Sequence, residues 1–142
     1  MSTEFENKPE KLNDETRADL KQLSRAMLRL HKTLLDAAKL DYEAKNGKIA
    51  NVNVYFQLVI DDPFFQWLRK FSSLIALIDE AVSVRRPASE PEAQALFSEA
   101  KLLLNFGDAD EEFNDKFQTA LQNNADAVIG HNDARALAAR AK

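Results

Sequence analysis

The sequence predicts an all-α protein, a single-domain helical bundle of about five to six helices. Only three glycines and four prolines occur among its 142 residues, whereas a β-sandwich or barrel needs a turn roughly every 8–12 residues. Apolar residues recur at three- and four-residue steps through most of the chain, which is the spacing of one helix face. The length and the apolar fraction of 45% suit one hydrophobic core.

The first predicted element is a long helix that opens the bundle domain. Residues 1–12 read as a flexible polar N-terminal segment, and the domain is expected to span residues 13–142. Asn13 or Asp14 provides the helix cap, and the helix runs to about Asn46, where Gly47 is expected to supply a left-handed C-terminal cap. At ~1.5 Å per residue its length is on the order of 45–50 Å, more than a compact domain of this size requires. The predicted apolar stripe is Leu20, Leu23, Met27, Leu30, Leu34 and Ala38.

Residues 52–60 fit two kinds of secondary structure. Their apolar residues alternate as in a strand, but Val52, Tyr55, Phe56 and Val59 also form a helical stripe. A lone strand must find a partner for its backbone groups, and no other segment reads as a strand. We therefore expect a helix.

A third helix is expected from Pro63 to about Val84, with Asp62 as its N-terminal cap. Phe65 and Leu77 fall outside its main stripe, so it is apolar on more than one face and is expected to be the central helix. The main stripe is Phe64, Trp67, Leu68, Phe71, Leu74, Ile75, Ile78 and Val82.

The last part of the chain predicts two further helices and a weaker third. A linker covers residues 85–91, and a fourth helix follows at about 91–105, ended by Gly107. A fifth helix begins near Asp110. The tail from Asp126 is rich in alanine and weakly amphipathic, so we expect a short helix that frays.

Composition makes several classes of function improbable. The net charge of −4 gives no general attraction to nucleic acid, and the only compact basic groups are the pairs at 69–70 and 85–86. We therefore expect no nucleic-acid partner. No apolar run approaches the ~18–20 residues of a membrane span, and the N-terminus lacks the features of a signal peptide. With no cysteine in the chain, these features predict a cytoplasmic protein that does not bind membranes.

No catalytic motif is recognisable, and no catalytic residue, metal site or cofactor is predicted. Neither His31 nor His131 has a second donor at metal-binding spacing. His31 lies at the margin of the first apolar stripe and Asp79 at that of the third helix, so the two could pair across a helix interface. Together with Trp67 they are the weak candidates for ligand binding. Asp41, on the apolar side of the first helix, is expected to face water.

The middle of the chain resembles a known group of proteins. Leu30-His31-Lys32 with Leu34-Leu35-Asp36, then Asp62-Pro63-Phe64-Phe65 with Trp67-Leu68-Arg69, and Ile78-Asp79-Glu80, are similar to small bacterial helical-bundle proteins of unknown function. The likeness covers roughly residues 27–84. It implies a helical fold and a bacterial cytoplasmic setting, and it implies no substrate.

Two functions remain as hypotheses. The first is a non-enzymatic protein interaction or assembly module, which the long first helix and the second apolar face of the third helix favour. In this hypothesis the protein binds a protein partner or forms a symmetric homodimer through the first and third helices, with Phe65 and Leu77 in the interface. The alternative is a helical bundle that binds a small ligand or a metal at His31, Trp67 and Asp79, possibly as an enzyme.

Overall fold

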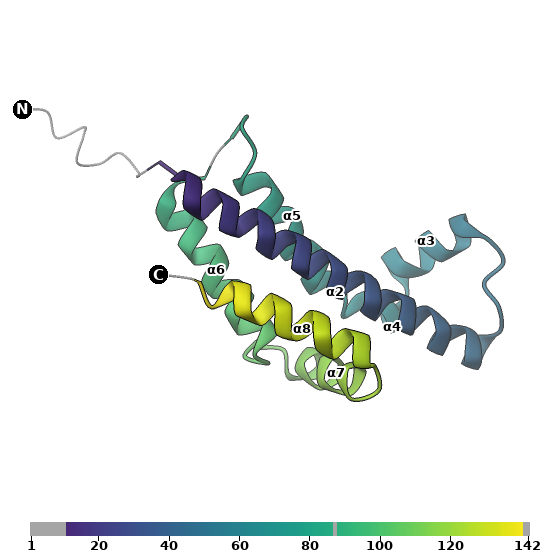
Figure 1. Cartoon of the computed structure of the whole chain (residues 1–142). Helices are drawn as coiled ribbons and strands as arrows, with labels where there is room; N and C mark the ends of the chain where they lie inside the picture. The colour runs from purple at the N-terminus through teal and green to yellow at the C-terminus, as the bar shows by residue number, and fades with distance from the viewer. Residues whose placement is uncertain (1–10, 87, 141–142) are drawn as a thin grey trace, which may run out of the picture.

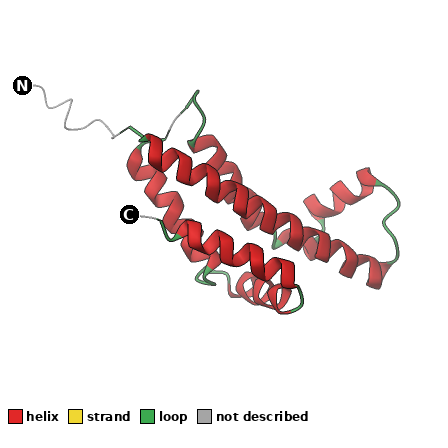
Figure 2. Ribbon diagram, viewed as in Figure 1, coloured by secondary structure: helices red, strands yellow, loops and turns green. Residues whose placement is uncertain are grey.

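The computed structural model describes residues 11–86 and 88–140. Within these residues the chain forms seven α-helices and no strand, which confirms the predicted all-α class (Figures 1 and 2). The count exceeds the expected five to six because the third predicted helix is divided in two and the tail forms a full helix. The helices are α2 (Asp14–Asn46), α3 (Val52–Asp61), α4 (Pro63–Gln66), α5 (Arg69–Ala81), α6 (Glu90–Leu104), α7 (Glu111–Gln122) and α8 (Ala125–Ala138).

Helix α2 is the central element of the fold. It begins after Asn13, whose side chain accepts a hydrogen bond from the Thr16 amide at 2.7 Å. It ends at Gly47, whose φ of 87° is one that side chains rarely adopt. Every residue of the predicted apolar stripe is buried, and α4, α5, α6 and α8 all pack against this helix. The expectation that the third helix is central was therefore wrong, because α2 is longer and contacts more elements.

Helices α5 and α8 both run antiparallel to α2. The Ser24 hydroxyl of α2 donates to Asp79 of α5, and Arg140, which follows α8, donates to Asp19 near the start of α2 at 3.0 Å. Helix α6 packs against both α5 and α8. These four helices enclose the core at one end of the molecule, while α3 lies at the opposite end, beside the last turns of α2 (Figure 1).

The prediction that the tail frays was wrong. Helix α8 buries Ala127, Ala134 and Ala138 against the core. At Gly130 an added Cβ would lie only 3.6 Å from the Leu30 Cα atom, so α8 and α2 are in close contact there. Small side chains permit this approach, and they also explain the weak apolar signal of the tail, since alanine contributes little to a hydrophobic stripe.

The predicted helix from Pro63 to Val84 is interrupted. Asp62 accepts a hydrogen bond from the Phe64 amide at 2.9 Å, as expected of its N-terminal cap. At the break the Leu68 amide donates to the Phe65 carbonyl oxygen at 3.1 Å, a bond between residues three apart that tightens the chain as in a 3₁₀ turn. Helix α5 then ends at Ala81, before Val84.

The end of α6 differs from the expected glycine cap. The residue with positive φ is Phe106, at 60°, and not Gly107. The Gly107 amide donates to the Leu102 carbonyl oxygen at 2.8 Å, which is the bond of a Schellman motif with phenylalanine where glycine is usual. The Phe106 ring packs against Phe117 and His131, with centroid distances of 5.1 and 5.4 Å. We infer that this packing offsets the unfavourable backbone conformation.

Residues 52–60 are helical, as predicted, but their expected stripe was partly wrong. Tyr55, Leu58 and Val59 of α3 are half-buried, whereas Val52 and Phe56 are exposed. Helix α3 has no fully buried residue, because it covers only the end of α2 and the short α4.

Residues 1–10 of the predicted flexible segment lie outside the described residues, whereas Lys11 and Leu12 are described. Lys11 forms an isolated antiparallel bridge with Ser89, and Leu12 is buried. The Glu90 carboxylate accepts from the Asn13 amide at 3.2 Å and from the Thr16 hydroxyl at 3.0 Å, which ties the starts of α2 and α6 together. None of the helices in the described ranges is long and apolar enough to cross a membrane.

The cap at Asp62 yields a first prediction. Asp62→Ala should lower the free energy of unfolding by ~0.5–2 kcal/mol, because the Phe64 amide loses its acceptor. Urea denaturation followed by circular dichroism measures this. Asp61→Ala is the matched control: Asp61 is exposed, and its side chain makes no hydrogen bond among the described residues. Equal stability of the two variants would contradict the capping role.

Candidate functional site

His31 and Asp79 do not form the pair that the sequence allowed. Asp79 is exposed and accepts a hydrogen bond from the Ser24 hydroxyl. His31 lies seven residues after Ser24 on α2, about 10 Å farther along the helix axis. It is half-buried, and no hydrogen bond to its ring is found among the described residues. Burial lowers the pKa of the His31 imidazole. His31 and Asp79 therefore do not belong to one site.

His131 is the histidine that packing and hydrogen bonding fix in place. It is buried on α8, with its Nε2 atom 2.6 Å from the carbonyl oxygen of Leu104. Its ring also packs against Phe117, with a centroid distance of 5.2 Å. Burial lowers the pKa of His131, and the nearby charge of Arg135 acts in the same direction, although the bond to the Leu104 carbonyl opposes them. A neutral ring that donates from Nε2 fits this environment, so His131 joins α8 to the end of α6.

The structure provides no obvious metal centre. Within residues 11–86 and 88–140 no group of three or more histidine, cysteine, aspartate or glutamate residues is placed to hold a metal ion. The metal-binding part of the alternative hypothesis therefore has no geometric support in this part of the chain.

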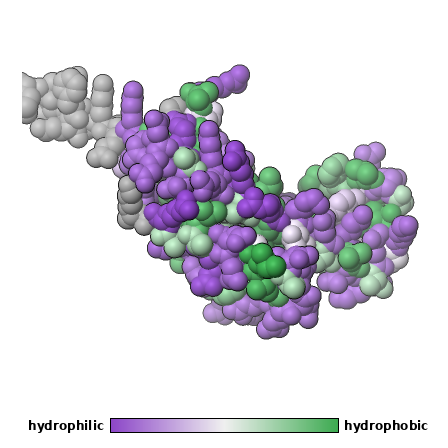
Figure 3. All heavy atoms as spheres, in the orientation of Figure 1, coloured by the Kyte–Doolittle hydropathy of each residue, from purple (hydrophilic) through white to green (hydrophobic). Residues whose placement is uncertain are grey.

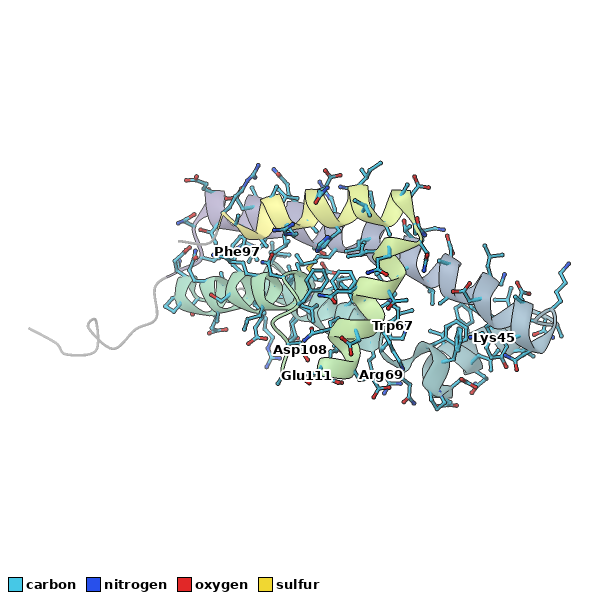
Figure 4. All side chains as sticks on the ribbon, turned by 90° about the horizontal axis from the view of Figure 1, so that it is seen from below. Lys45, Trp67, Arg69, Phe97, Asp108 and Glu111 are labelled. Carbon is cyan, nitrogen blue, oxygen red and sulfur yellow. The ribbon has the colours of Figure 1, made fainter. Side chains whose placement is uncertain are left out.

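Trp67 lines a cleft of the molecule. It belongs to the predicted apolar stripe of the third helix, but it is only half-buried, in the turn after α4, and packs against Phe113 of α7, with a centroid distance of 6.0 Å. Figure 4 shows Trp67 where the chain between α4 and α5 meets α7. With Leu34 and Ala38 of α2, it lines a cleft of about 450 Å³ between α2, α4 and α7.

Charged residues of both signs line this cleft together with its apolar side chains. Phe64 adds a second aromatic ring to the Trp67 side. Asp41 and Lys45 contribute from α2, and Asp115 and Lys116 from α7. Lys45 also lies over the Phe64 ring, with its Nζ atom 5.5 Å from the centroid. Such a cleft can hold a small molecule with an apolar body and polar ends. Asp41 is exposed, as the sequence predicted.

The two interface candidates on the third predicted helix are placed very differently. Phe65 is buried within the chain, between the rings of Tyr42 and Tyr55 at centroid distances of 5.5 and 6.2 Å. It cannot contribute to an interface of the folded protein, so that assignment was wrong. Sequence reasoning placed it on a free face because it could not foresee that α3 folds back over it. Leu77 is 55% exposed and lines a groove between α5 and α6.

Helix α3 carries several exposed apolar side chains, which the sequence analysis did not select as candidates. Val52, Phe56 and Ile60 are 64%, 58% and 54% exposed, and their spacing of four residues places them on one face. We call these three residues the α3 stripe. Figure 3 shows hydrophobic residues on the lobe that holds α3. The available signal was composition, since residues 52–60 contain no charged residue in a chain that is 30% charged.

Comparison with known proteins gives no family for this chain. It matches no model of a protein family, no curated protein and no solved structure. The resemblance to bacterial helical-bundle proteins thus stays a prediction, and any function must be argued from the geometry.

The buried histidine predicts how stability depends on pH. In the unfolded chain His131 titrates near its ordinary pKa of 6.5, while burial lowers the pKa in the folded protein. Below about pH 6.5 the unfolded state therefore binds more protons, and the free energy of unfolding should fall as the pH drops from 7.5 to 5.5. Urea denaturation at several pH values measures this fall.

The matched variant is His131→Gln, which keeps a hydrogen-bond donor and does not titrate. It should show a smaller fall than the unmodified protein. His31→Gln combined with His131→Gln should be flatter still, because the pKa of His31 is also lowered by burial. If all three proteins showed the same pH dependence, the fall in stability could not come from these two histidines.

Proposed function

We propose that this protein is a non-enzymatic assembly module that self-associates through the α3 stripe. The observation that carries the proposal is the set of three large apolar side chains, each more than half exposed, on one face of an uncharged helical segment. Single exposed apolar residues are ordinary on protein surfaces, but a contiguous set often marks an interaction site.

The position of α3 supports this role. It lies at the end of the molecule opposite the four-helix core, beside the last turns of α2 (Figure 1). Its inner face is held by Tyr55, which packs against Phe65 and under Lys39, whose Nζ atom is 5.1 Å from the Tyr55 ring centroid. The outer face is thus presented on a supported helix.

The order of residues in the α3 stripe favours a second copy as the partner. Phe56 lies at the centre, with a β-branched residue one turn away on each side, Val52 before it and Ile60 after it. Two such helices packed antiparallel around a two-fold axis would place Phe56 against Phe56 and each Val52 against an Ile60. A two-fold interface requires a self-complementary surface of this kind. No charge between residues 52 and 60 opposes the pairing.

The size of the surface around the α3 stripe determines the affinity expected of the dimer. A ten-residue helix is about 15 Å long, so it presents less than the ~800 Å² per partner that a standard stable interface buries. We therefore expect a dimer that dissociates on dilution through the micromolar range.

Sedimentation velocity across a range of concentrations tests the proposal. The unmodified protein should shift from monomer to dimer, and Phe56→Glu should raise the dissociation constant at least about tenfold, since it buries a charge at the centre of the contact. Ile129→Glu is the matched control, because Ile129 of α8 is similarly exposed, at 60%, and lies outside α3. Circular dichroism verifies that both variants fold. A monomer at hundreds of micromolar, or an equal effect of both substitutions, would contradict the proposal.

The cleft beside Trp67 supports a second candidate function, the binding of a small ligand. Its two aromatic rings and its charged residues of both signs suit an amphipathic molecule. A thermal-shift screen with amphipathic amines and carboxylates should find a stabilising compound, because a ligand that binds only the folded state raises the melting temperature.

Trp67 fluorescence should respond to the same compound, since this is the only tryptophan in the chain. Asp41→Asn combined with Asp115→Asn should weaken the effect of a cationic hit. Asp133→Asn, on the exposed side of α8, is the control. Failure of every compound to shift either signal would leave the cleft without a ligand-binding role.

A further inference from the structure

We infer that the groove between α5 and α6 binds a basic amphipathic helix of a partner protein. This groove has a volume of about 540 Å³ and lies apart from the α3 stripe and from the Trp67 cleft. The inference is therefore independent of the proposed self-association.

The floor of the groove suits large apolar side chains. Leu77 of α5 and Leu96 of α6 line it together with the alanines at 81, 88 and 95. Although Leu77 belongs to α5, one of the helices that enclose the core, its side chain is more than half exposed. Small residues between two leucines leave space into which the side chains of an incoming helix can insert, as in other complexes where a helix fills a groove.

The rim of the groove carries an excess of negative charge. Glu80 of α5 and Glu92 and Glu99 of α6 line it, with Arg86 as the single cation among the lining residues. The Nη1 atom of Arg86 lies 3.7 Å from the Oε1 atom of Glu80, and the two side chains are highly exposed, at 82% and 61%. Such an ion pair contributes little stability, so a basic partner can replace it. Complementary charge then favours a partner rich in lysine or arginine.

The spacing of the glutamates on the rim predicts the spacing of the basic residues in the partner helix. Glu92 and Glu99 lie seven residues apart on α6, which is two helical turns or about 10.5 Å. A helix lying along the groove would match them with basic residues at positions i and i+7. Its apolar residues at i+3 and i+4 would then face the floor.

The chain's own N-terminal segment is a poor occupant of this groove. Lys11, at the end of this segment, forms an isolated antiparallel β-bridge with Ser89, which lies near the groove. Residues 1–10, however, contain three glutamates and one lysine, so their charge has the same sign as the rim. Charge complementarity therefore favours a separate, basic partner.

The test uses the full chain and a fluorescein-labelled 18-residue helical peptide of leucine and lysine, with lysines at i and i+7 and leucines at i+3 and i+4. A second peptide has glutamate in place of every lysine. Fluorescence anisotropy should show binding of the lysine peptide only. Glu92→Gln combined with Glu99→Gln should weaken it up to about thirtyfold, since each of the two exposed ion pairs contributes up to about 1 kcal/mol and about 1.4 kcal/mol corresponds to tenfold. Leu77→Ser should weaken it without affecting the salt dependence.

A matched variant separates the groove from general attraction to an acidic protein. Asp126→Asn combined with Asp133→Asn removes the same charge from two exposed positions on α8 and should leave the affinity unchanged. The inference is overturned if the glutamate peptide binds equally well, or if the Asp126 and Asp133 variant loses as much affinity as the groove variant. It is also overturned if removal of residues 2–10 raises the affinity about tenfold, because the chain's own segment would then be the occupant.

Discussion

The layout of the molecule depends on how the apolar stripe of α2 is covered. A helix of 33 residues is about 50 Å long, whereas α5, α6 and α8, with 13 to 15 residues each, are only about 20 Å long. The contacts of Asp19 with Arg140 and of Ser24 with Asp79 place α8 and α5 along the first part of α2. The last turns of α2 then need other cover. There Tyr42 of α2 packs against the rings of Phe64 and Phe65, so α3 and α4 form a second, smaller packing unit at that end.

A cluster of rings joins the two parts of the fold. Trp67 and Phe71, on either side of the start of α5, pack against Phe113 of α7. Phe117 extends this cluster to Phe106 and to His131 on α8. Because these rings come from four separate stretches of the chain, the cluster fixes α7 across the end of the core. The wall of the cleft beside Trp67 is therefore held by ring packing, while the α3 stripe lies on a helix with no fully buried residue.

Sequence reasoning located most helices because their signals are local. The cap at Asn13, the stop at Gly47 and the cap at Asp62 each depend on a few adjacent residues, and all three are confirmed. The α2 stripe could also be predicted, because one long helix shows its period clearly. The break after α4 had no comparable signal, since Trp67 and Leu68 continue the helical pattern.

The candidate sites were harder to predict because they depend on which helices meet. Phe65 looked free on a helical wheel, and only the fold shows that Tyr42 and Tyr55 cover it. His131 gave no sign of its bond to Leu104, which lies 27 residues earlier. Alanine hides the packing of α8 for a related reason, because close approach between helices depends on small side chains and not on a strong apolar stripe.

The antiparallel contact of α2 with α8 has a consequence for synthesis. Its members Asp19 and Arg140 are 121 residues apart, so α2 is complete long before the helix that covers one side of it exists. At ~5–20 residues per second, the ribosome needs about 4–16 s to add the roughly 80 residues between the end of α2 at Asn46 and the start of α8 at Ala125. During that interval Leu30 and its neighbours have no α8 to shield them from water. Until α8 has left the ribosome, the nascent chain is thus open to chaperones and to aggregation.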